Sequence, residues 1–315
     1  MAEQIEKIVL VTRRTRLEDL LVRFGTRDQA RFYLEHMGVS FEEYADEHAT
    51  YMAALERVRR AFPRRLRFAE IERELLPAYL FTEHDLVVVV GQDGLVVNCA
   101  KYLSGQPVLA VNPDPGRFDG VLLPFGLSDA GPAVHAVLEG HAGLRRITMA
   151  SATLNDGQRI DAVNDLFIGI ASHASARYDL VWQGRRESQS SSGIIVSTGA
   201  GSTGWYRSIL TGSAGITAAV GADEEALRMR DLYRFDWDAP ELRFCVREPF
   251  ISRHSSADTC WGAIRAGEAL SVVSQMPADG VIFSDGVLSD AVAFNSGAIA
   301  TVTVAGRHLH LVTPV

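Results

Sequence analysis

The feature that most limits how this chain can fold is the apolar run Leu86–Val90, Leu-Val-Val-Val-Val, and the turn Gly91-Gln92-Asp93-Gly94 that follows it at once. A nearly pure β-branched run such as this is typical of a central parallel strand that is covered on both faces. A short helical stretch, Leu95–Leu103, and a second apolar run, Val108–Val111, come next. Because neighbouring parallel strands need a crossover connection, these segments predict a βαβ unit.

The rest of the N-terminal region predicts one more strand and a long helix. Ile8–Val11 is a short β-branched run, and the apolar residues of Phe41–Phe62 recur at helical intervals. We expect the chain between Val11 and Leu86 to be helical. A Pro- and Gly-containing stretch, residues 113–116, ends the βαβ unit, and the composition changes near residues 126–131. The sequence therefore predicts an α/β domain over residues 1–128.

After residue 128 the pattern becomes mainly that of β-strands. Arg146–Thr153 alternates, Asn155-Asp156-Gly157 is a hairpin-turn sequence, and Ala162–Ile170 is the returning strand. Further strands are predicted at Tyr178–Trp182, Ile194–Ser197, Leu242–Val246, Leu270–Ser274, Val281–Phe283 and Ile299–Val304. Ser188–Ser192 is expected to be a polar loop, and Thr211–Glu225 shows no clear period. The predicted fold class is an α/β domain followed by a mainly β domain over residues 129–315, whose last strand could return to the first domain.

Composition fits a chain with two cores and argues against two classes of partner. With 315 residues, 47% of them hydrophobic, the chain is long enough to divide its core between two domains. Its formal charge is -8, and no Lys/Arg run supplies the positive surface that duplex nucleic acid or an anionic membrane would need. A small phosphorylated ligand needs only local positive potential and stays compatible with this composition.

The cysteines and the N-terminal sequence favour the cytoplasm. Cys99, Cys245 and Cys260 are odd in number and form no Cys-x-x-Cys pair, which argues against a disulfide framework and a zinc cluster. The charged start of the sequence runs into Ile8–Val11 without a signal or transit pattern, and no apolar run approaches transmembrane length. We therefore expect a cytoplasmic protein.

The turn Gly91–Gly94 is the first candidate site, because it lies between the carboxyl end of a buried strand and a helix, where open α/β sheets bind ligands. Glycine lets backbone N–H groups approach an anion, and the helix N-terminus adds partial positive charge, so the turn suits polyphosphate. A carboxylate is unfavourable there unless it orients a hydroxyl, accepts its proton or holds Mg²⁺. Asp93 therefore has either one of these roles or the structural role of a helix cap.

The second candidate is Gly199–Gly204, Gly-Ala-Gly-Ser-Thr-Gly, between the strand Ile194–Ser197 and a short helical pattern. It satisfies the dinucleotide fingerprint Gly-x-Gly-x-x-Gly, but no crossover to a further strand follows, so a Rossmann dehydrogenase lacks its context. The same residues fit a variant hydrolase nucleophile elbow with Ser202 as nucleophile, although no pattern of partnered Asp and His follows. A plain strand-to-helix turn is the remaining alternative.

The third candidate is the pair Asn164-Asp165, which lies within an otherwise apolar segment. Buried polar side chains need hydrogen-bond partners, because a buried polar group without one lowers the stability of the folded state. An amide and a carboxylate together can bind the hydroxyls and ring nitrogens of a nucleoside, or they can serve a turn or an internal hydrogen-bond network. No histidine spacing matches a metal site built from protein ligands, and a Walker A sequence is absent.

Taken together, these motifs, in this order and at these intervals, resemble the NAD kinase family, and the likeness is closest to the mitochondrial type of NAD kinase. Four further segments carry the resemblance: Pro107–Pro115, Ser191–Gly193, Arg247–Pro249 and Phe294–Ala300. It extends from about Ile8 to Val304, and several motifs in register make it more specific than any one alone.

The resemblance implies an α/β nucleotide-binding domain over residues 1–128 and a β-rich dinucleotide-binding domain over residues 129–315. It also implies assembly as a homodimer or homotetramer, with the ligands in the cleft between the domains. Asp93 would act on the ribose 2′-hydroxyl, and the nucleotide phosphates would bind at Gly91, Gln92, Gly94 and Asn98. The residues that would bind the dinucleotide are Asn164, Asp165, Ser192, Gly201, Ser202, Thr203, Gly204 and Ser208.

The chain departs from the family pattern at a few of these positions. The family's turn is Gly-Gly-Asp-Gly-Thr, whereas this chain has Gln92 and Leu95, which removes a glycine and a hydroxyl. Asp165 replaces the more usual glutamate and keeps its charge. Ser192 stands where other branches of the family carry an aspartate, but the mitochondrial type also has serine there.

The sequence thus predicts an NAD(H) kinase that transfers the γ-phosphoryl group of ATP, accompanied by Mg²⁺, to the adenosine ribose of NAD or NADH. One alternative is a catalytically impaired dinucleotide-binding regulator, in which Gln92 and Leu95 have abolished transfer. Another is a related kinase that acts on a lipid or a sugar. The sequence does not distinguish NAD from NADH as acceptor, or ATP from polyphosphate as donor.

Overall fold

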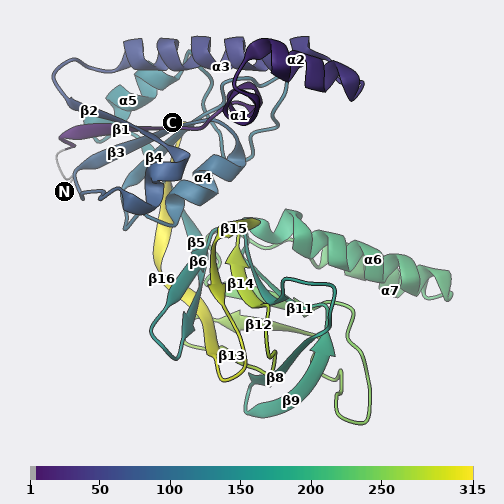
Figure 1. Cartoon of the computed structure of the whole chain (residues 1–315). Coiled ribbons are helices and arrows are strands. Elements are labelled where there is room, and N and C mark those ends of the chain that lie inside the picture. The colour runs from purple at the N-terminus through teal and green to yellow at the C-terminus, as the bar shows by residue number, and fades with distance from the viewer. Residues whose placement is uncertain (1–4, 315) are drawn as a thin grey trace. The chain divides into compact units, whose positions relative to one another are not determined.

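The computed structural model describes residues 5–314 of the chain, which form two compact units (Figure 1). The first unit comprises the chain up to Arg145 together with the C-terminal residues from His310 onward. The second unit is Arg146–Leu309. The division therefore lies later than the predicted boundary after residue 128. Helix α5 (Ala130–Leu138) accounts for the difference, because its apolar face is buried in the core of the first unit.

The first unit is built on a parallel sheet with the strand order β2-β1-β3-β4. Its strands are β1 (Lys7–Thr12), β2 (Arg67–Glu72), β3 (Asp85–Val90) and β4 (Pro107–Val111). All six residues of β3 are buried, and helix α4 (Asp93–Ala100) connects this strand to β4. The predicted central strand and the predicted βαβ unit are therefore confirmed.

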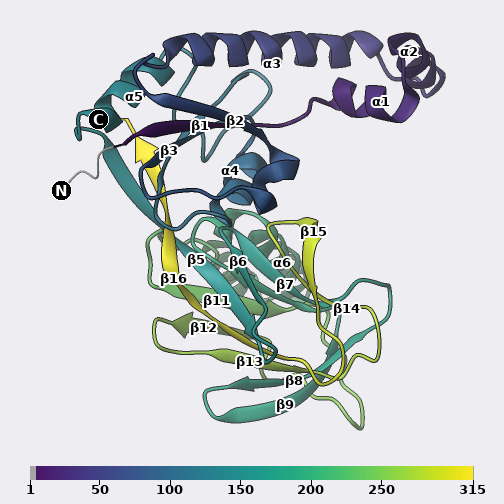
Figure 2. The same ribbon diagram turned by 60° about the vertical axis from the view of Figure 1, so that its left-hand side comes forward.

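Helices cover both faces of this sheet, with α3 and α5 on one side and α4 on the other (Figure 2). Helix α3 (Phe41–Ala61) matches the predicted long helix, and its residues Tyr51, Leu55 and Val58 belong to the core that includes the strands. Before it lie α1 (Arg16–Phe24) and α2 (Arg27–His36), which share a smaller core with the start of α3.

One prediction for this unit is wrong, because the chain between Val11 and Leu86 is not helical throughout. It also contains β2 and the 3-10 helix η1 (Arg73–Ala78). Strand β2 is at the end of the strand order, and Ile71 is its one buried residue. Such a strand shows no apolar run or strict alternation in the sequence.

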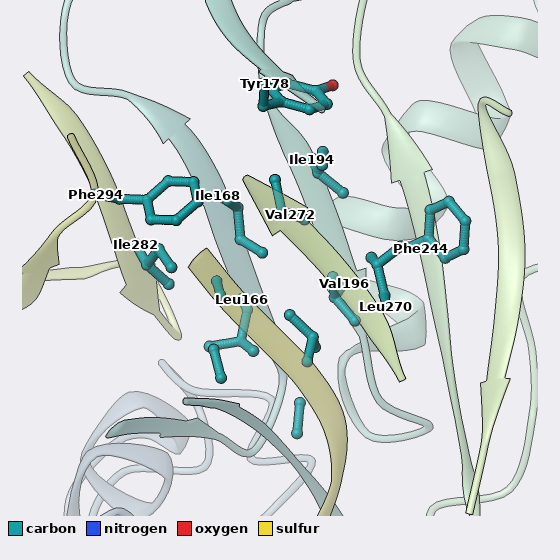
Figure 3. Close-up of a cluster of buried hydrophobic side chains, with 14 of the residues drawn as sticks. Leu166, Ile168, Tyr178, Ile194, Val196, Phe244, Leu270, Val272, Ile282 and Phe294 are labelled. Atoms are coloured by element: carbon teal, nitrogen blue, oxygen red, sulfur yellow. The ribbon is translucent and has the colours of Figure 1, made fainter. Parts of the chain in front are cut away.

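The second unit consists of two β-sheets packed face to face. The first is a six-stranded antiparallel sheet with the order β12-β11-β10-β7-β14-β15. In the other, β13 pairs with β16 and β8, β8 pairs with β9, and β5 pairs with β6 and β16. The inner faces meet in one apolar core, where Leu166 and Val196 of one sheet face Leu270 and Val272 of the other (Figure 3).

The strands of the six-stranded sheet are β7 (Asp165–Ile170), β10 (Ile194–Ser197), β11 (Glu241–Val246), β12 (Trp261–Arg265), β14 (Gly280–Ser284) and β15 (Val287–Ala293). Those of the other are β5 (Gly143–Leu154), β6 (Arg159–Ala162), β8 (Ala176–Trp182), β9 (Arg185–Ser191), β13 (Leu270–Ser274) and β16 (Ile299–Thr313). The end of β16 pairs in parallel with β4 through His310 and Leu311, within the first unit. The predicted fold class, an α/β unit followed by a mainly β unit, is confirmed.

Two strand predictions for the second unit need correction. The sequence predicts one strand over Ala162–Ile170, but the structure divides this segment between β6 and β7, which belong to different sheets. It also predicts a loop at Ser188–Ser192, but most of that segment lies in β9, whose buried positions are polar: Glu187, Gln189 and Ser191. The hairpin at Asn155–Gly157 is confirmed by the pairing of β5 with β6.

The segment Thr211–Glu225, which has no clear apolar period, is largely helical. Helix α6 (Trp205–Ala219) runs into it and α7 (Asp223–Asp231) follows. The buried residues of α6 are few, and glycines at 212 and 215 dilute its pattern further. In the part of the chain that the structure describes, no helix is both long and apolar enough to cross a membrane.

Candidate functional site

In the first unit, the carboxyl ends of β1 and β3 form the edge at which a ligand is expected. β2 lies on one side of β1, and β3 and β4 lie on the other, so the strand order reverses between β1 and β3. Open α/β sheets bind ligands outside the carboxyl ends of their strands at such a reversal. The segments that emerge there are Arg13-Arg14-Thr15 after β1 and Gly91-Gln92-Asp93 after β3.

Asp93 is the first residue of α4 and is half-buried. Its Oδ1 accepts a hydrogen bond of 2.6 Å from the backbone N–H of Leu122, in the loop after β4. The carboxylate therefore does not act as the helix cap, since Gln92 occupies the N-cap position and makes no side-chain capping bond. Among residues 5–314 no donor binds Oδ2, so this oxygen is available to a hydroxyl group of a ligand.

The two departures in the glycine turn are accommodated without backbone strain. Gln92 has φ -97° and ψ 164°, an extended conformation that any residue adopts, and its side chain is exposed. Leu95 is buried, and a Cβ added at Gly91 would lie 2.8 Å from its Cδ2, so the leucine fills the space beside the turn. Gly94 has open space around it, and Asn98 is buried one turn further along α4.

Three arginines meet at the same edge around Glu47, a buried residue of α3. Arg13 Nη2 lies 3.1 Å and Arg16 Nε 2.5 Å from the Glu47 carboxylate, and Arg117 Nη1 lies 3.5 Å from it. Burial alone would raise the pKa of Glu47, but hydrogen bonds from Arg16 and Arg13 outweigh burial and hold this pKa below its ordinary value. Arg117 also lies 3.5 Å from Asp114, so three guanidinium groups face two carboxylates and leave a local excess of one positive charge. No sequence motif indicates this arginine cluster, Arg13, Arg16 and Arg117.

Hydrogen bonds connect the arginine cluster to the glycine turn. The hydroxyl of Tyr51 donates to the carbonyl oxygen of Val90 at 2.9 Å and accepts the N–H of Arg13 at 3.0 Å. Arg117 belongs to the same loop that donates to Asp93. Positive charge therefore lies close to the glycine turn, which suits an anionic ligand at this edge.

In the second unit, the pair Asn164-Asp165 forms the bend between β6 and β7 and packs directly on the turn Gly199–Gly204. A Cβ added at Gly201 would lie 2.0 Å from the carbonyl oxygen of Asn164, so this position requires glycine. The N–H of Thr198 donates to that same carbonyl at 2.9 Å, and its hydroxyl donates to Val163 and accepts from the N–H of Gly201. The structure thus brings two of the predicted motifs together.

Asp165 is buried, with 8% of its surface exposed, yet its carboxyl group has no hydrogen-bond partner among residues 5–314. Burial, together with the nearby charge of Asp285, raises the pKa of Asp165 to about 7. The side chain of Asn164 is half-buried and likewise makes no hydrogen bond within the described chain. Because buried polar groups without partners are costly, a ligand that bonds both side chains would gain affinity here.

A second carboxylate, that of Asp285, lies beside this bend, and no sequence motif assigns it there. Its Oδ1 accepts the N–H groups of Asn164 at 2.7 Å and Asp165 at 3.3 Å, and its Oδ2 accepts that of Val163 at 3.2 Å. In return, the N–H of Asp285 donates to the carbonyl oxygen of Asp165 at 2.9 Å. The dipeptide Asp285-Gly286 is a hairpin-turn signal in the sequence, but that signal does not reveal a contact with a distant segment.

The other predicted residues of the glycine turn differ in exposure. Ser202 is buried, and its hydroxyl donates to the carbonyl oxygen of Gly199 at 2.7 Å, so it holds the turn and is no free nucleophile. Thr203 and Gly204 are exposed at the start of α6, and Ser208 Oγ donates to the Gly204 carbonyl at 3.3 Å. The exposed start of this helix adds partial positive charge beside the turn.

Ser192 is connected to the start of α6 through Arg247. The N–H of Ser192 donates to the carbonyl of Arg247 at 2.9 Å, and the Arg247 guanidinium lies 5.0 Å from the ring centre of Trp205, the first residue of α6. Trp205 in turn stacks on Phe167 of β7, with their ring centres 5.7 Å apart. These contacts connect the backbone of Ser192, through Arg247, to the aromatic residues at the start of α6.

Across residues 5–314 the structure brings together no group of three or more His, Cys, Asp or Glu side chains that could hold a metal ion. Mg²⁺ beside nucleotides is ordinarily held by phosphates, waters and one or two carboxylates rather than by an all-protein cage. Asp93 is the carboxylate at the glycine turn that could contribute to such an ion.

The two units, a parallel α/β sheet with helices on both faces and a mostly antiparallel β unit, define a class of fold that solved structures share over nearly the whole chain. No protein-family model matches the sequence, and no curated protein is similar enough to match it. The class of fold is therefore known from structure alone.

One similar structure is that of yeast NADH kinase complexed with NADH. It is 16% identical, has a TM-score of 0.60, and aligns over 99% of this chain and 85% of its own. Another is that of an NAD kinase from Archaeoglobus fulgidus in complex with ATP, which is 14% identical, has a TM-score of 0.55, and aligns over 97% of this chain and 92% of its own. This chain therefore has the fold of NAD and NADH kinases.

Proposed function

We propose that this protein is an NAD(H) kinase, which transfers the γ-phosphoryl group of ATP to the adenosine ribose 2′-hydroxyl of NAD or NADH and so forms NADP(H). The observation that carries the proposal is the position of Asp93 at the carboxyl end of β3, with one carboxylate oxygen bound to Leu122 and the other open. The fold shared with yeast NADH kinase and the Archaeoglobus fulgidus NAD kinase supports it.

On the acceptor side, the dinucleotide binds at the bend and the glycine turn of the second unit. Asn164 and Asp165 bond the adenosine through hydroxyls and ring nitrogens, since both side chains lack protein partners in the described chain. The exposed residues Thr203, Gly204 and Ser208 offer the helix N-terminus and hydroxyls to the rest of the molecule. Ser192 and Gly201 complete the dinucleotide site, and the buried Ser202 keeps the turn in shape.

On the donor side, the phosphates of ATP bind at Gly91–Gly94 and the start of α4. The arginine cluster supplies the positive charge that the chain as a whole, with its net charge of -8, lacks. Mg²⁺ accompanies ATP and neutralises charge on its phosphate oxygens.

At the reacting atoms, Asp93 orients the acceptor. Its open oxygen accepts the hydrogen of the ribose 2′-hydroxyl, which directs that oxygen at the γ-phosphorus. The bond from the 2′-oxygen to phosphorus forms as the bond between the β- and γ-phosphates breaks, ADP leaves, and the hydroxyl proton passes to Asp93 late in the transfer. The other oxygen of Asp93 stays on the N–H of Leu122, which keeps the side chain in place.

The substitution Asp93→Asn tests this role. We expect kcat to fall by about 100-fold to 10,000-fold, because the amide cannot accept the proton, while the Kd values of NADH and ATP change little. The measurements are chromatographic detection of NADP and NADPH, and NADH fluorescence titration. Asp46→Asn, which alters an exposed carboxylate on α3, is the matched control and should behave as the wild type. Near-normal turnover in Asp93→Asn would remove Asp93 from the mechanism.

The same assay separates the alternative functions. A dinucleotide-binding regulator binds NADH and ATP but forms no product, and a lipid or sugar kinase consumes ATP in the presence of diacylglycerol or a sugar panel but leaves NAD and NADH unchanged. The unstrained backbone at Gln92 argues against a distorted turn as a cause of impaired catalysis, and the assay tests the loss of the threonine hydroxyl at Leu95. Assembly as a homodimer or homotetramer and a cytoplasmic location remain predictions from the sequence.

A further inference from the structure

Asp285 opens the hairpin turn between β14 and β15, where both turn residues have left-handed backbone angles. The φ angle is +54° at Asp285 and +72° at Gly286. Asp and Asn both tolerate such angles, so the turn by itself does not require a carboxylate. A second reason for the carboxylate must lie in what its oxygens contact.

Those oxygens bind three successive backbone N–H groups, those of residues 163, 164 and 165, at distances from 2.7 to 3.3 Å. The N–H groups belong to the bend where the chain leaves one sheet and enters the other, so the ordinary strand ladders cannot satisfy all of them. Charge-assisted bonds of this kind are stronger than neutral ones. Asp285 therefore fixes the backbone that carries Asn164 and Asp165.

The charge of Asp285 also acts on Asp165, and other charged groups nearby are paired. Asp161 on β6 is bound by Arg159 and Arg307, and Arg243 on β11 is bound by Glu241. Ser197, which lies opposite Asp165 on β10, is uncharged. Burial and Asp285 together raise the pKa of Asp165 to about 7, so near neutral pH its carboxyl group is protonated in a large fraction of molecules.

We propose that Asp285 is a positioning residue of the dinucleotide site: its carboxylate holds the bend that presents Asn164 and Asp165, and its charge sets whether Asp165 donates or accepts a hydrogen bond. The proposal rests on the proposed function only in taking NAD or NADH as the ligand. A protonated Asp165 donates to an acceptor atom such as a ring nitrogen, whereas the ionised form only accepts, from ribose hydroxyls. Dinucleotide affinity therefore depends on pH through Asp165.

The test compares Asp285→Asn with the wild type by NADH fluorescence titration from pH 5.5 to pH 8.5, without ATP. Asparagine keeps the left-handed turn but loses the charge and one acceptor oxygen. We expect NADH affinity to fall about tenfold at neutral pH, and the midpoint of its pH dependence to move to lower pH, because the charge beside Asp165 is gone. Asp279→Asn is the matched control, since Asp279 also has a left-handed backbone, with φ +59°, in the turn before β14.

Each result has a distinct meaning. Wild-type affinity and an unchanged pH midpoint in Asp285→Asn overturn the role of Asp285. If the wild type shows no saturable NADH binding, the proposed function and this inference both fail, whereas NADH binding without phosphoryl transfer overturns only the kinase.

Should Asp285→Asn fail to fold, Asp165→Asn provides the test, because the proposal requires this variant to abolish the wild-type pH dependence of NADH binding. Carboxyl ¹³C NMR of the wild type must then show Asp165 titrating near pH 7, and a midpoint near 4 overturns the proposal.

Discussion

Asp165 shows how its surroundings decide what a carboxyl group does. In the unfolded chain an aspartate has a pKa of about 3.9, whereas burial and the charge of Asp285 raise the pKa in the folded protein to about 7. Between these two values the folded state binds one more proton than the unfolded state. The free energy of unfolding contributed by this group therefore falls as pH rises from about 4 to about 7.

The substitution Asp165→Asn removes this pH dependence. The wild type is expected to lose about 2.6 kcal/mol from this group between pH 5 and pH 8, and the variant should not. The variant's free energy of unfolding, relative to that of the wild type, should therefore increase with pH. Urea denaturation at both pH values measures the difference, and a relative stability that is the same at pH 5 and pH 8 would contradict the raised pKa. Asp156→Asn, at the exposed tip of the β5–β6 hairpin, is the control.

At this scale the sequence reveals some site residues and hides others for a physical reason. Asp93 and Asn164-Asp165 stand out because each is a polar interruption next to an apolar strand. Glu47 and Asp285 do not, because a glutamate on a charged helix and an aspartate in a hairpin turn both have ordinary local explanations. Their contacts join segments far apart in the chain, such as Asp285 and Asn164, which lie 121 positions apart.

The arginine cluster gives an element-scale prediction, since it joins the end of β1, helix α3 and the loop after β4. We expect Arg16→Ala to raise the KM for ATP about tenfold and to leave the KM for NADH unchanged, because one charge-assisted contact to the phosphates is lost. Arg16 is half-exposed but Glu47 is buried, so the variant should also lose some stability, limited by the contacts that Glu47 keeps with Arg13 and Arg117. Arg60→Ala on α3, whose side chain is 82% exposed, is the control.

Steady-state kinetics with each substrate varied in turn measures this effect. An unchanged KM for ATP in both Arg16→Ala and Arg117→Ala would show that the cluster only stabilises the fold around Glu47. Parallel increases in the KM values of ATP and NADH would instead indicate general disruption of the first unit.

The close packing of the glycine turn on the Asn164 bend gives a second prediction at this scale. Gly201→Ala places a Cβ about where the Asn164 carbonyl oxygen now lies, so the two elements must separate. We expect a loss of about 1–3 kcal/mol in the free energy of unfolding and weaker NADH binding. Gly212→Ala is a matched substitution in α6 with no atom near the new Cβ, and it should stabilise the protein by about 0.5–1 kcal/mol. If Gly201→Ala is as stable as Gly212→Ala, the packing described between turn and bend is wrong.

Elements with a clean pattern could be predicted from the sequence, and those without one could not. Strand β3 is apolar at nearly every position because both of its faces are covered, and its helix and partner strand follow directly. Strand β9 was not predicted because its buried positions hold Glu187, Gln189 and Ser191, which bond other side chains and backbone instead of packing in an apolar core. A periodicity argument cannot detect such a strand.

At the scale of the whole molecule, the two units have separate apolar cores, and most residues proposed to bind ATP lie in one unit and most proposed to bind the dinucleotide in the other. One core contains β1, β3, β4, α3 and α5, and the other lies between the two sheets of the second unit. The sequence could predict this division because its strand pattern changes along the chain, but it placed the boundary too early. The composition change near residue 128 precedes α5, which is an amphipathic helix that packs on the first core.

All four tryptophans, Trp182, Trp205, Trp237 and Trp261, lie in the second unit, so tryptophan fluorescence reports on that unit alone. A ligand that binds only the native form raises the stability of the unit that holds it, by about 2.7 kcal/mol at a concentration of 100 times its Kd. NADH should therefore raise the midpoint of the thermal transition followed by tryptophan fluorescence. ATP should raise a transition that calorimetry detects and tryptophan fluorescence does not.

The Asp93→Asn variant allows both ligands to be present without turnover, so the two shifts can be measured separately and together. If each ligand stabilises its own unit, the shift of the tryptophan transition with NADH should be the same with and without ATP. A shift of that transition by ATP alone, as large as the shift by NADH, would place the nucleotide in the second unit and contradict the donor site at Gly91–Gly94. A single cooperative transition in both measurements would instead show that the two cores unfold together, which β16 would explain because this strand contributes residues to both units.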